Sequence, residues 1–460
     1  MLLTFLYSLF RLIKTKLRFD NVILLKEVFI IVIPKLTSFA MHLSSSSKKR
    51  VLFIGGNYYP EPTGIGKYNG EMIDQLANFG YQCTVITSFP YYPFWQVQKP
   101  YAKHSFWFKH EKKNVHLSAD NWIDIYRCPQ YVPKRPTGLR RMLLDLSFCC
   151  SSLVTVVKLI FCEKYDYIFT VVPGFPAGIL GVFYKRIKGG KFIYHIQDLQ
   201  IDAASELNII KSKLVVRILL KMEKYLLKNA DVVSSISQGM IKKIKNKYNR
   251  EVILFPNWVD TNDFYPITEN TSLKKAFGFN LTDKIILYSG AIGEKQGLEI
   301  ILDIAPYFKS NANLKFVICG SGPYKEKLQH EASAKCCDNI VFLPIQPKEK
   351  LNLFLNMADA HMVLQKLNAA DLVMPSKLTT ILSVGGMALI SASSGSTLYD
   401  IIITHKLGLP IDPDSKESLI KAINNFLQSD VQVYKLNARK YAEMHLSMDK
   451  IIPDYLKHLQ

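Results

Sequence analysis

Residues Arg50–Thr87 read RVLFIGGNYYPEPTGIGKYNGEMIDQLANFGYQCTVIT. They contain a short apolar strand, a glycine-rich loop that runs from Gly55 to Gly66, a helical segment and a second apolar strand. This order and spacing predict a βαβ unit, with parallel strands and helices on both faces of the sheet. The loop follows the carboxyl end of the first strand, where open α/β sheets bind ligands. It is longer than the turn of the dinucleotide motif G-x-G-x-x-G, so the sequence does not favour an oxidoreductase.

The same alternation continues to Ile236 and restarts after the segment Pro256–Asp260, which we interpret as a hinge. In the first half we expect further strands at Tyr167–Val172, Lys191–His195 and Asp231–Ile236, and helices at Lys67–Gly80, Gly178–Ile187 and Lys211–Asn229. In the second half we expect strands at Lys284–Ser289, Leu314–Cys319, Ile340–Leu343, Ala360–Gln365 and Ala388–Ala392, and helices at Leu298–Phe308, Tyr324–Ala334, Lys348–Met357 and Ser376–Val384. The expected fold class is α/β, with two doubly wound, Rossmann-like parallel-sheet domains that face a cleft.

The length agrees with more than one domain, because 460 residues exceed what one hydrophobic core usually organises. We expect an N-terminal extension at residues 1–48, an N-terminal domain at 49–260, a C-terminal domain at 261–430 and a C-terminal helical segment at 431–460. With 48% hydrophobic and 21% charged residues, the composition is that of a globular protein. The net charge of +20 favours an anionic partner, namely nucleic acid, a phosphorylated ligand or an anionic membrane.

The eight cysteines do not indicate a metal site. None forms a C-x-x-C pair or has the spacing of a zinc site, and most lie in apolar runs. We therefore expect buried free thiols in a reducing compartment.

The first 48 residues are rich in Lys and Arg, with apolar residues interleaved and only Asp20 and Glu27 as acids. The longest apolar run, Val28–Pro34, is too short to span a bilayer, and a cleavable signal peptide fits the pattern poorly. Two interpretations stay open: a basic amphipathic segment that lies in the membrane interface, or a translation start at Met41.

A candidate anion site lies in Leu364–Gly386, which reads LQKLNAADLVMPSKLTTILSVGG. Pro375 suits the first turn of a helix, and Gly385 suits its end. A helix start flanked by Lys366 and Lys377 offers free backbone N–H groups and positive charge to an anion. The alternative is an ordinary surface turn before a core helix.

A second candidate site follows the strand Lys191–His195, where the chain reads His195-Ile196-Gln197-Asp198. A histidine and a carboxylate at the carboxyl end of a parallel strand stand where ligand-binding and catalytic groups usually lie. The alternative is a structural histidine whose hydrogen bonds are satisfied inside the core.

Several longer motifs occur along the chain: PYYPFWQV, HIQDLQIDA, SSISQGM, FPNWVD, LYSGAIGEKQGLE, GSGP and ILSVGG, together with the glycine-rich loop and the LQKLNAADLVMPSKLT run. From Arg50 to its end, the chain resembles the GT-B glycosyltransferases of family 4, and in particular a subgroup that works in bacterial exopolysaccharide biosynthesis. The N-terminal extension lies outside this resemblance.

The resemblance implies an enzyme of surface polysaccharide biosynthesis (exopolysaccharide, capsule or O-antigen). Such an enzyme moves a sugar from a nucleotide sugar with retention of configuration, without a metal and without a cofactor besides the donor. The C-terminal domain would bind the donor, which the subgroup suggests is GDP-fucose and which could instead be a UDP-linked N-acetyl sugar. The N-terminal domain would bind a growing glycan on undecaprenyl diphosphate, in the cytoplasm at the inner face of the membrane.

Carried over to matching positions, the resemblance implies three groups of site residues. The catalytic group is His195, Asp198 and Asp371. The donor-binding group is Gly290, Gly293, Glu294, Lys295, Gly320, Gly322, Lys366, Ser376, Lys377, Leu378 and Thr380. The loop for the acceptor or its phosphate contains Gly55, Gly56, Gly64, Gly66 and Lys67.

The chain departs from the family pattern at several donor positions. Many family members have an arginine and a lysine where this chain has Ala291 and Gln296, and a glutamate where it has Thr380. Asp371 is the carboxylate nearest to the place of the other family glutamate. We therefore expect other groups to stabilise the charge on the leaving phosphate: the side chains of Lys295, Lys366 and Lys377, and the N–H groups of Gly293 and of the turn at Ser376.

Three other functions stay open. A non-catalytic subunit of the same fold would bind lipid-linked sugar without transfer, and the missing arginine, lysine and glutamate motivate it. A nucleotide-sugar epimerase of the same two-domain shape would act without an acceptor. Nucleic-acid binding is disfavoured, because the basic residues are dispersed and no RNA or DNA motif occurs.

Overall fold

The computed structural model describes residues 48–459, apart from 63, 116–117, 136, 163, 175, 200, 202–211, 269–270 and 368–374. The expected N-terminal extension therefore lies outside the described residues, except for Lys48. Two parallel-stranded sheets organise the described part, as the alternating pattern predicted.

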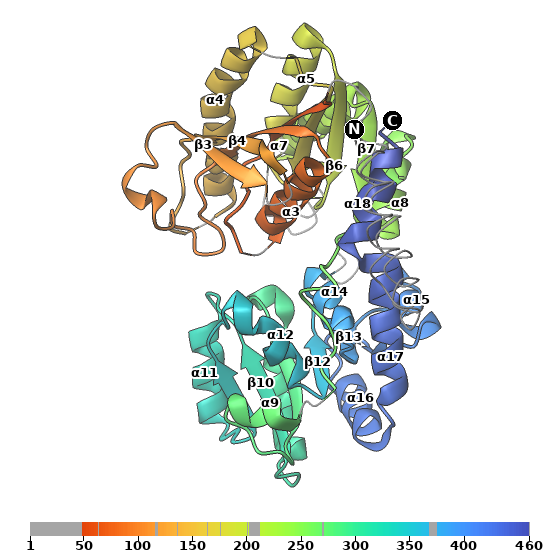
Figure 1. Ribbon diagram of the computed structural model, residues 1–460. Coiled ribbons are helices and arrows are strands. Elements are labelled where there is room, and N and C mark those ends of the chain that lie inside the picture. The colour runs from red at the N-terminus through yellow and green to blue at the C-terminus, as the bar shows by residue number, and fades with distance from the viewer. Residues whose placement is uncertain are drawn as a thin grey trace, which may run out of the picture. The chain divides into compact units, whose positions relative to one another are not determined.

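The first sheet has eight strands in the order β3-β4-β2-β1-β5-β6-β7-β8 (Figure 1). These are β1 (Arg50–Ile54), β2 (Gln82–Ser88), β3 (Lys109–Val115), β4 (Ser118–Cys128), β5 (Tyr167–Val172), β6 (Lys191–Ile196), β7 (Val232–Ser235) and β8 (Ile253–Leu254). All neighbours are parallel except β3 and β4, which form an antiparallel pair at the edge. The strand order reverses at β1, so the carboxyl ends of β1 and β5 form a switch point of the kind that binds ligands.

Helices cover both faces of this sheet, because successive side chains of each strand point to opposite faces. On one face the core receives buried side chains from α4 (Gly138–Cys162), α5 (Pro176–Lys188), α7 (Lys213–Asn229) and α8 (Gln238–Tyr248). On the other face it receives Tyr68 and Met72 from α3 (Gly64–Asn78). Figure 1 shows α4 and α5 side by side.

The second sheet has six strands in the order β11-β10-β9-β12-β13-β14, and all its pairs are parallel. The strands are β9 (Lys284–Ser289), β10 (Leu314–Cys319), β11 (Ile340–Leu343), β12 (Ala360–Val363), β13 (Ala388–Ser391) and β14 (Gly408–Ile411). The helices are α9 (Thr271–Ala276), α10 (Glu299–Ile304), α11 (Lys325–Ala334), α12 (Lys348–Asn356), α14 (Ser376–Ser383), α15 (Thr397–Thr404) and α16 (Lys416–Gln428). The strand order reverses at β9, which gives a second switch point beside β12.

The C-terminal segment joins both cores. It consists of α17 (Gln432–Tyr441), the π-helical turn η4 (Ala442–Leu446) and α18 (Met448–Lys457). Ala438 of α17 packs in the core of the second sheet. Ile452 and Tyr455 of α18 pack in the core of the first sheet. The helical pattern expected at the end of the chain is therefore present, and its last helix covers the α3 side of the first sheet.

Several element bounds differ from those expected. The helix expected at Leu298–Phe308 is α-helical only as far as Ile304 and continues as the 3-10 helix η3 (Ala305–Phe308). Pro306 has no N–H group, so the α-helical hydrogen bond at that position cannot form. Eight of the described strands and α-helices were not predicted from the sequence: β3, β4, β8, β14, α4, α8, α9 and α15.

Candidate functional site

The expected site residues gather at the carboxyl ends of both sheets. In the first sheet Gly55 follows β1 and Asp198 follows β6. In the second sheet Gly290 follows β9 and Gly320 follows β10. Each group lies at the edge where parallel sheets bind ligands.

Gly320 and Gly322 allow two loops of the second sheet to meet backbone to backbone. A Cβ atom at Gly320 would lie 1.9 Å from the Gly290 carbonyl oxygen, and one at Gly322 would lie 2.1 Å from the Ile292 carbonyl oxygen. The Gly290 N–H donates to the Cys319 carbonyl at 3.0 Å. Side chains at these glycines would separate the loops, so the glycines shape the expected donor edge.

Gln296 closes the turn η2 (Glu294–Gln296) that follows the first of these loops. Its Oε1 atom accepts a hydrogen bond from the Gly293 N–H at 3.1 Å. The Gly293 N–H, which we expected to bind phosphate, is therefore engaged inside the turn. Glu294 and Lys295 are exposed.

Lys366, which follows β12, is held in an ion pair. Its Nζ atom lies 2.6 Å from Oε1 of Glu299, at the start of α10. This hydrogen bond raises the pKa of Lys366. Part of the positive charge that we expected from Lys366 is thus balanced by a neighbouring carboxylate.

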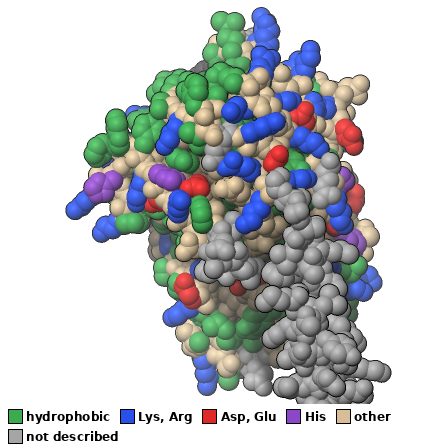
Figure 2. Space-filling view, turned by 45° about the horizontal axis from the view of Figure 1, so that its top comes forward, with side chains coloured by type: hydrophobic (Ala, Val, Ile, Leu, Met, Phe, Trp, Pro, Cys, Tyr) green, Lys and Arg blue, Asp and Glu red, His purple; other side chains and the backbone are tan. Residues whose placement is uncertain are grey.

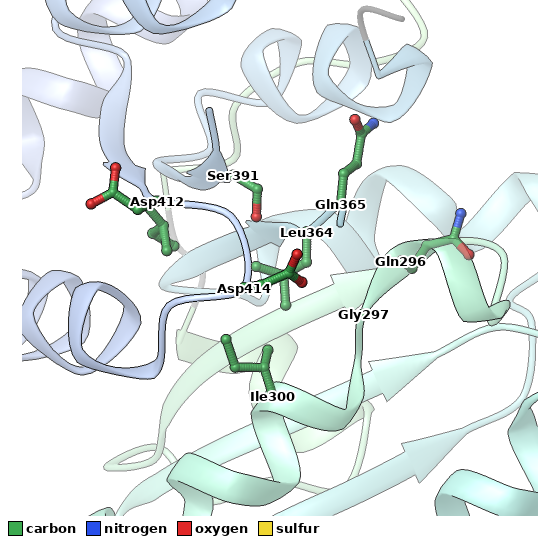
Figure 3. Close-up of a pocket in the computed structure, with 9 residues that line it drawn as sticks. Gln296, Gly297, Ile300, Leu364, Gln365, Ser391, Asp412 and Asp414 are labelled. Carbon is green, nitrogen blue, oxygen red and sulfur yellow. The ribbon is translucent and has the colours of Figure 1, made fainter. Parts of the chain in front are cut away.

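A small cavity lies beside this pair, at the carboxyl ends of β12, β13 and β14 (Figure 3). It is lined by Gln296, Gly297, Ile300, Leu364, Gln365, Ser391, Ile411, Asp412 and Asp414. Its volume is about 10 Å³, roughly the room that one water molecule needs. Since ligand sites usually measure about 300–1,000 Å³, this cavity can accept only one small polar group of a ligand.

Lys377 is the most distinctive charged group at this edge. It lies in the first turn of α14, and its Nζ atom is buried with no hydrogen-bond partner among the residues that the structure describes. The same atom lies 3.8 Å from the centroid of the Tyr288 ring, and a Cβ atom at Gly290 would lie 3.9 Å from it. Burial lowers the pKa of Lys377 to about 7. A buried ammonium that has no carboxylate partner in the described part of the chain is costly, so this arrangement fits an anionic ligand.

Three other buried polar atoms near the same edge have no hydrogen-bond partner within the described ranges. They are Oε2 of Glu299, Oε1 of Gln365 and Oγ of Ser393. Native structures leave few such atoms unsatisfied. Together with Lys377, they are polar groups whose hydrogen bonds a ligand or ordered water at this edge of the second sheet could satisfy.

The remaining expected donor residues lie on or before α14. Ser376 is exposed and Thr380 is half-buried. The side chain of Leu378 is fully buried in the core, so only its backbone is available to a ligand. Asp371 lies outside the described residues.

Glu61 organises the loop of the first sheet, and the sequence analysis did not single it out. Its buried carboxyl group accepts hydrogen bonds from the N–H groups of Tyr91 and Tyr92 at 3.1 and 3.0 Å, and from Nδ2 of Asn57 at 2.9 Å. A Cβ atom at Gly66 would lie 2.4 Å from Oε2 of Glu61, so the glycine leaves room for this carboxyl group. Burial raises the pKa of Glu61 to about 7, although the hydrogen bonds oppose the shift.

The other glycines of this loop also have structural roles. The Gly55 N–H donates to the Ile86 carbonyl at 3.0 Å, and the Gly56 carbonyl accepts from Oγ of Ser88 at 2.6 Å. Gly64 begins α3 with φ of +64°, in the left-handed region that favours glycine. The loop thereby turns directly into α3.

Lys67 is paired within α3. Its Nζ atom lies 3.7 Å from Oε1 of Glu71. The other oxygen of Glu71 accepts a hydrogen bond from Nε1 of Trp258 at 2.9 Å. Lys67 therefore offers less net charge to a phosphate than its place in the loop suggested.

His195 and Asp198 occupy different surroundings. His195 is 2% exposed, its Nδ1 atom lies 3.0 Å from Oγ of Ser234, and that hydroxyl lies 2.8 Å from the Tyr455 hydroxyl of α18. Burial lowers the pKa of His195 to about 3. This placement favours the structural interpretation of His195. Asp198 is half-buried beyond the end of β6, and burial raises its pKa while Lys295 opposes the shift.

Arg141 and Asp145 of α4 reach the same part of the first sheet, and the sequence analysis missed both. The guanidinium carbon of Arg141 lies 5.1 Å from the centroid of the Trp95 ring, and its charge acts on Asp198. Burial raises the pKa of Asp145 to about 7, with Arg141 opposing. A carboxylate inside the apolar run LLDLSF was the available signal, because buried carboxylates with shifted pKa values mark candidate sites.

Metal-type ligands do not cluster in the described part of the chain: it contains no group of three or more His, Cys, Asp or Glu side chains that could hold an ion. The eight cysteines are all free, and Cys150, Cys162 and Cys336 are exposed. The expectation of buried thiols is therefore wrong for these three.

The chain matches known proteins along most of its length. The family of glycosyl transferases group 1 matches residues 269–443. An Escherichia coli K12 protein provisionally named colanic acid biosynthesis glycosyl transferase WcaI is 36% identical over 419 residues, which cover 89% of this chain and 100% of that protein. Sucrose-phosphate synthase from Thermosynechococcus elongatus superposes with a TM-score of 0.70 at 15% identity, over 89% of this chain and 98% of that one. Anabaena HepE in complex with UDP-glucose superposes with a TM-score of 0.62 at 13% identity, over 89% of this chain and 99% of that one. The two-sheet fold is therefore the GT-B fold predicted above, and the chain belongs to the group 1 glycosyltransferases.

Proposed function

We propose that this glycosyltransferase moves a sugar from a nucleotide sugar to a lipid-linked glycan intermediate of surface polysaccharide biosynthesis. The C-terminal half binds the donor, either GDP-fucose or a UDP-linked N-acetyl sugar, and the N-terminal half binds the acceptor. The reaction retains the anomeric configuration, needs no metal and takes place in the cytoplasm, at the inner face of the membrane.

The observation that carries this proposal is the buried Nζ atom of Lys377 beside Gly290, which has no hydrogen-bond partner among the described residues. It lies at the end of β9, where a doubly wound sheet presents its loops to a ligand. The buried polar atoms of Glu299, Gln365 and Ser393 near the same edge supply further groups for a nucleotide sugar. The UDP-glucose complex of the structural neighbour HepE and the name of the 36% identical relative support the same substrate class.

Lys377 is the group that would assist departure of the donor phosphate. Negative charge grows on the leaving diphosphate while the sugar gains oxocarbenium character. A buried ammonium stabilises that charge more strongly than an exposed one, because the local dielectric constant is low. The first turn of α14, which carries Lys377, also presents free N–H groups and the positive end of the helix dipole.

The N-terminal half offers groups suited to a sugar hydroxyl. Asp198 lies beyond β6 and Asp145 lies in α4, and burial raises the pKa of both carboxyl groups. A raised pKa makes a carboxyl group better able to exchange a proton with a hydroxyl. Arg141, whose charge acts on both carboxyl groups, can contact a phosphate of the acceptor lipid.

The test combines donor binding with transfer. Full-length protein is heated with GDP-fucose, UDP-N-acetylglucosamine or UDP-N-acetylfucosamine, with and without EDTA, and the unfolding temperature is measured. We expect one donor to raise the unfolding temperature by mass action, equally in EDTA. The wild type should then transfer the sugar to an undecaprenyl diphosphate-linked acceptor, and NMR of the product gives the anomeric configuration.

The outcomes separate the alternatives. Conversion of the nucleotide sugar without an acceptor would identify an epimerase. Binding of the lipid-linked sugar without any transfer would identify a non-catalytic subunit. Either result, or a requirement for a metal, would contradict the proposed reaction.

A further inference from the structure

The helix α4 is apolar on two opposite sides, and only one of them faces the core. Phe148, Val156 and Leu159 pack against the first sheet. A second row of residues is exposed and is here called the outer stripe: Leu139, Leu146, Cys150, Leu153, Val157 and Phe161. Their spacing of three, four or seven residues places them on one side of the helix. The exposed side of a helix on a soluble protein normally carries polar residues.

The exposed fractions of the Leu, Val and Phe side chains of the outer stripe range from 39% at Val157 to 83% at Phe161. Leu139 is 70% exposed, Leu146 is 54% exposed and Phe161 is 83% exposed. The adjacent helix α5 adds exposed Phe183 and Ile187. Figure 2 shows hydrophobic side chains gathered on this part of the surface, with Lys and Arg side chains among them. Contiguous apolar surface of this kind marks a contact with a partner or a membrane.

The charge around the outer stripe is positive. Residues 130–162 contain five Lys or Arg residues and a single acid, Asp145. Lys134, Arg135 and Arg140 are exposed at the start of the helix. Basic residues beside an apolar helix face are the pattern that binds anionic lipid head groups.

The packing of α4 decides how it would meet a bilayer. The helix is long and apolar enough to cross a membrane. However, its core side is buried against the sheet along with α5 and β4. A helix held on a sheet in this way can lie along the membrane surface but cannot cross it.

We infer that the outer stripe docks on the surface of an anionic lipid bilayer, with α4 parallel to the membrane plane. The first turn of the same helix carries Arg141, which acts on Asp198. This step rests on the proposed function, in which the acceptor is lipid-linked. Docking then brings that acceptor to the acceptor groups of the first sheet.

The exposed thiol of Cys150 reports on this contact in the unmodified full-length protein. Its neighbour Cys149 is a poor competitor, because burial raises the pKa of Cys149 to about 11 and thiols react as thiolates. The protein is labelled with a maleimide alone, with vesicles of phosphatidylglycerol and phosphatidylethanolamine, and with phosphatidylcholine vesicles. Mass spectrometry then gives the labelling rate of each cysteine. The exposed Cys336, beyond α11, serves as the internal control.

We expect anionic vesicles to slow the labelling of Cys150 several-fold and to leave the labelling of Cys336 unchanged. We expect neutral vesicles to have little effect on either cysteine. Unchanged labelling of Cys150 on vesicle-bound protein would overturn the inference, because binding would then use another part of the chain. If Cys150 becomes protected without vesicles as the protein concentration rises, the outer stripe contacts a second copy of the chain. Slow labelling without vesicles at every concentration would assign it to a segment of the same chain. Both results would also overturn the inference.

Paired variants test the stripe directly. Leu139→Gln with Leu146→Gln should bind anionic vesicles about tenfold more weakly, since two exposed leucines no longer enter the bilayer. Val433→Gln with Leu436→Gln is the matched control, with side chains that are 50% and 70% exposed on α17. Transfer to a water-soluble acceptor is measured without vesicles, so failure of the proposed reaction is seen separately from failure of docking. Equal vesicle binding by both pairs would contradict the inference.

Discussion

The loops that follow β1 and β9 hold the same place in their sheets, but the charged groups of the helices beside them differ. In the first sheet the cation at the start of α3 is paired with a carboxylate, because the Nζ atom of Lys67 lies 3.7 Å from Oε1 of Glu71. The nearby Glu61 is a buried acid whose pKa burial raises to about 7. In the second sheet Lys377 is a buried cation whose Nζ atom has no hydrogen-bond partner in the described part of the chain.

Because of this difference, the two halves of the chain suit different ligands. An unpaired buried cation gains most from an anion such as a diphosphate. In the first half, Asp198 and Asp145 have carboxyl groups whose pKa values burial raises, and such groups suit a neutral hydroxyl, whose proton they can take up or return. The fold alone would not distinguish the halves, because both sheets offer the same kind of switch point.

The largest expected effect is that of Lys377→Met. Removing one preorganised group that stabilises the leaving charge should lower kcat by about 10²–10³-fold. The folded state should not lose stability, because the removed charge is buried and has no hydrogen-bond partner within the described ranges. Steady-state kinetics and urea unfolding of both proteins check the two parts. A loss of stability with little loss of kcat would show that Lys377 is a structural residue.

The pH dependence of the same variant sharpens the test. In the folded protein the pKa of Lys377 is lowered from 10.5 to about 7. The unfolded chain therefore binds more protons between these values, so wild-type stability should rise relative to Lys377→Met as the pH increases across that range. Donor affinity of the wild type should fall over the same range, because the neutral amine attracts a diphosphate less. Urea unfolding and calorimetry below and above neutral pH measure both trends, and identical pH profiles of the two proteins would contradict the lowered pKa.

The next effect concerns the acceptor loop. In Gly66→Ala the new Cβ atom would lie 2.4 Å from Oε2 and 2.7 Å from Cβ of Glu61. Glu61 is held by the N–H groups of Tyr91 and Tyr92, so the free energy of unfolding should fall by about 1–3 kcal/mol. Gly56→Ala is the control, since its Cβ atom would meet no atom closer than 3.7 Å. Equal stability of the two variants in urea would show that Glu61 moves freely.

His195→Asn tests whether the histidine is catalytic or structural. The ring packs 5.0 Å from the centroid of Phe255, and its Nδ1 atom lies 3.0 Å from Oγ of Ser234. Asparagine can keep one hydrogen bond but loses the ring contact, so stability should fall by about 1–3 kcal/mol. We expect kcat/KM for transfer to stay close to that of the wild type, whereas Asp198→Asn should lower kcat. A large fall in kcat with unchanged stability would restore His195 as a catalytic residue.

Much of the fold could be predicted from the sequence, because several strands of the two sheets are short apolar runs followed directly by glycine or proline. The bounds of Lys284–Ser289, Leu314–Cys319 and Ile340–Leu343 agree with the structure for this reason. The β3–β4 pair could not be predicted, because β3 has the sequence KHEKKNV, which has little apolar pattern, and lies at an exposed edge. The helix α4 was missed because it is apolar on both sides.

The site residues could be predicted from the sequence only in part. The pattern around Pro375 predicted the start of α14 and a candidate site at Lys377, because helix starts have local sequence signals. The pairing of Lys366 with Glu299, and of Lys67 with Glu71, depends on which side chains meet in three dimensions. The burial of His195 likewise depends on α18, which is more than 250 residues away in the chain.

The smallest effect is expected from Lys366→Met, the other cation of the second sheet. The pair with Glu299 is partly exposed, with side chains 36% and 33% accessible, so its loss should cost less than about 1 kcal/mol of stability. The carboxylate of Glu299 would then repel the donor, and we expect KM for the nucleotide sugar to rise about threefold to tenfold with little change in kcat. The double variant Lys366→Met with Glu299→Gln should recover most of the lost affinity, because the repelling charge is removed as well. Steady-state kinetics of the single and double variants measure this coupling. If Lys366→Met instead lowered kcat as much as Lys377→Met does, both lysines would contact the leaving phosphate, and the contrast between a paired and an unpaired cation would no longer hold.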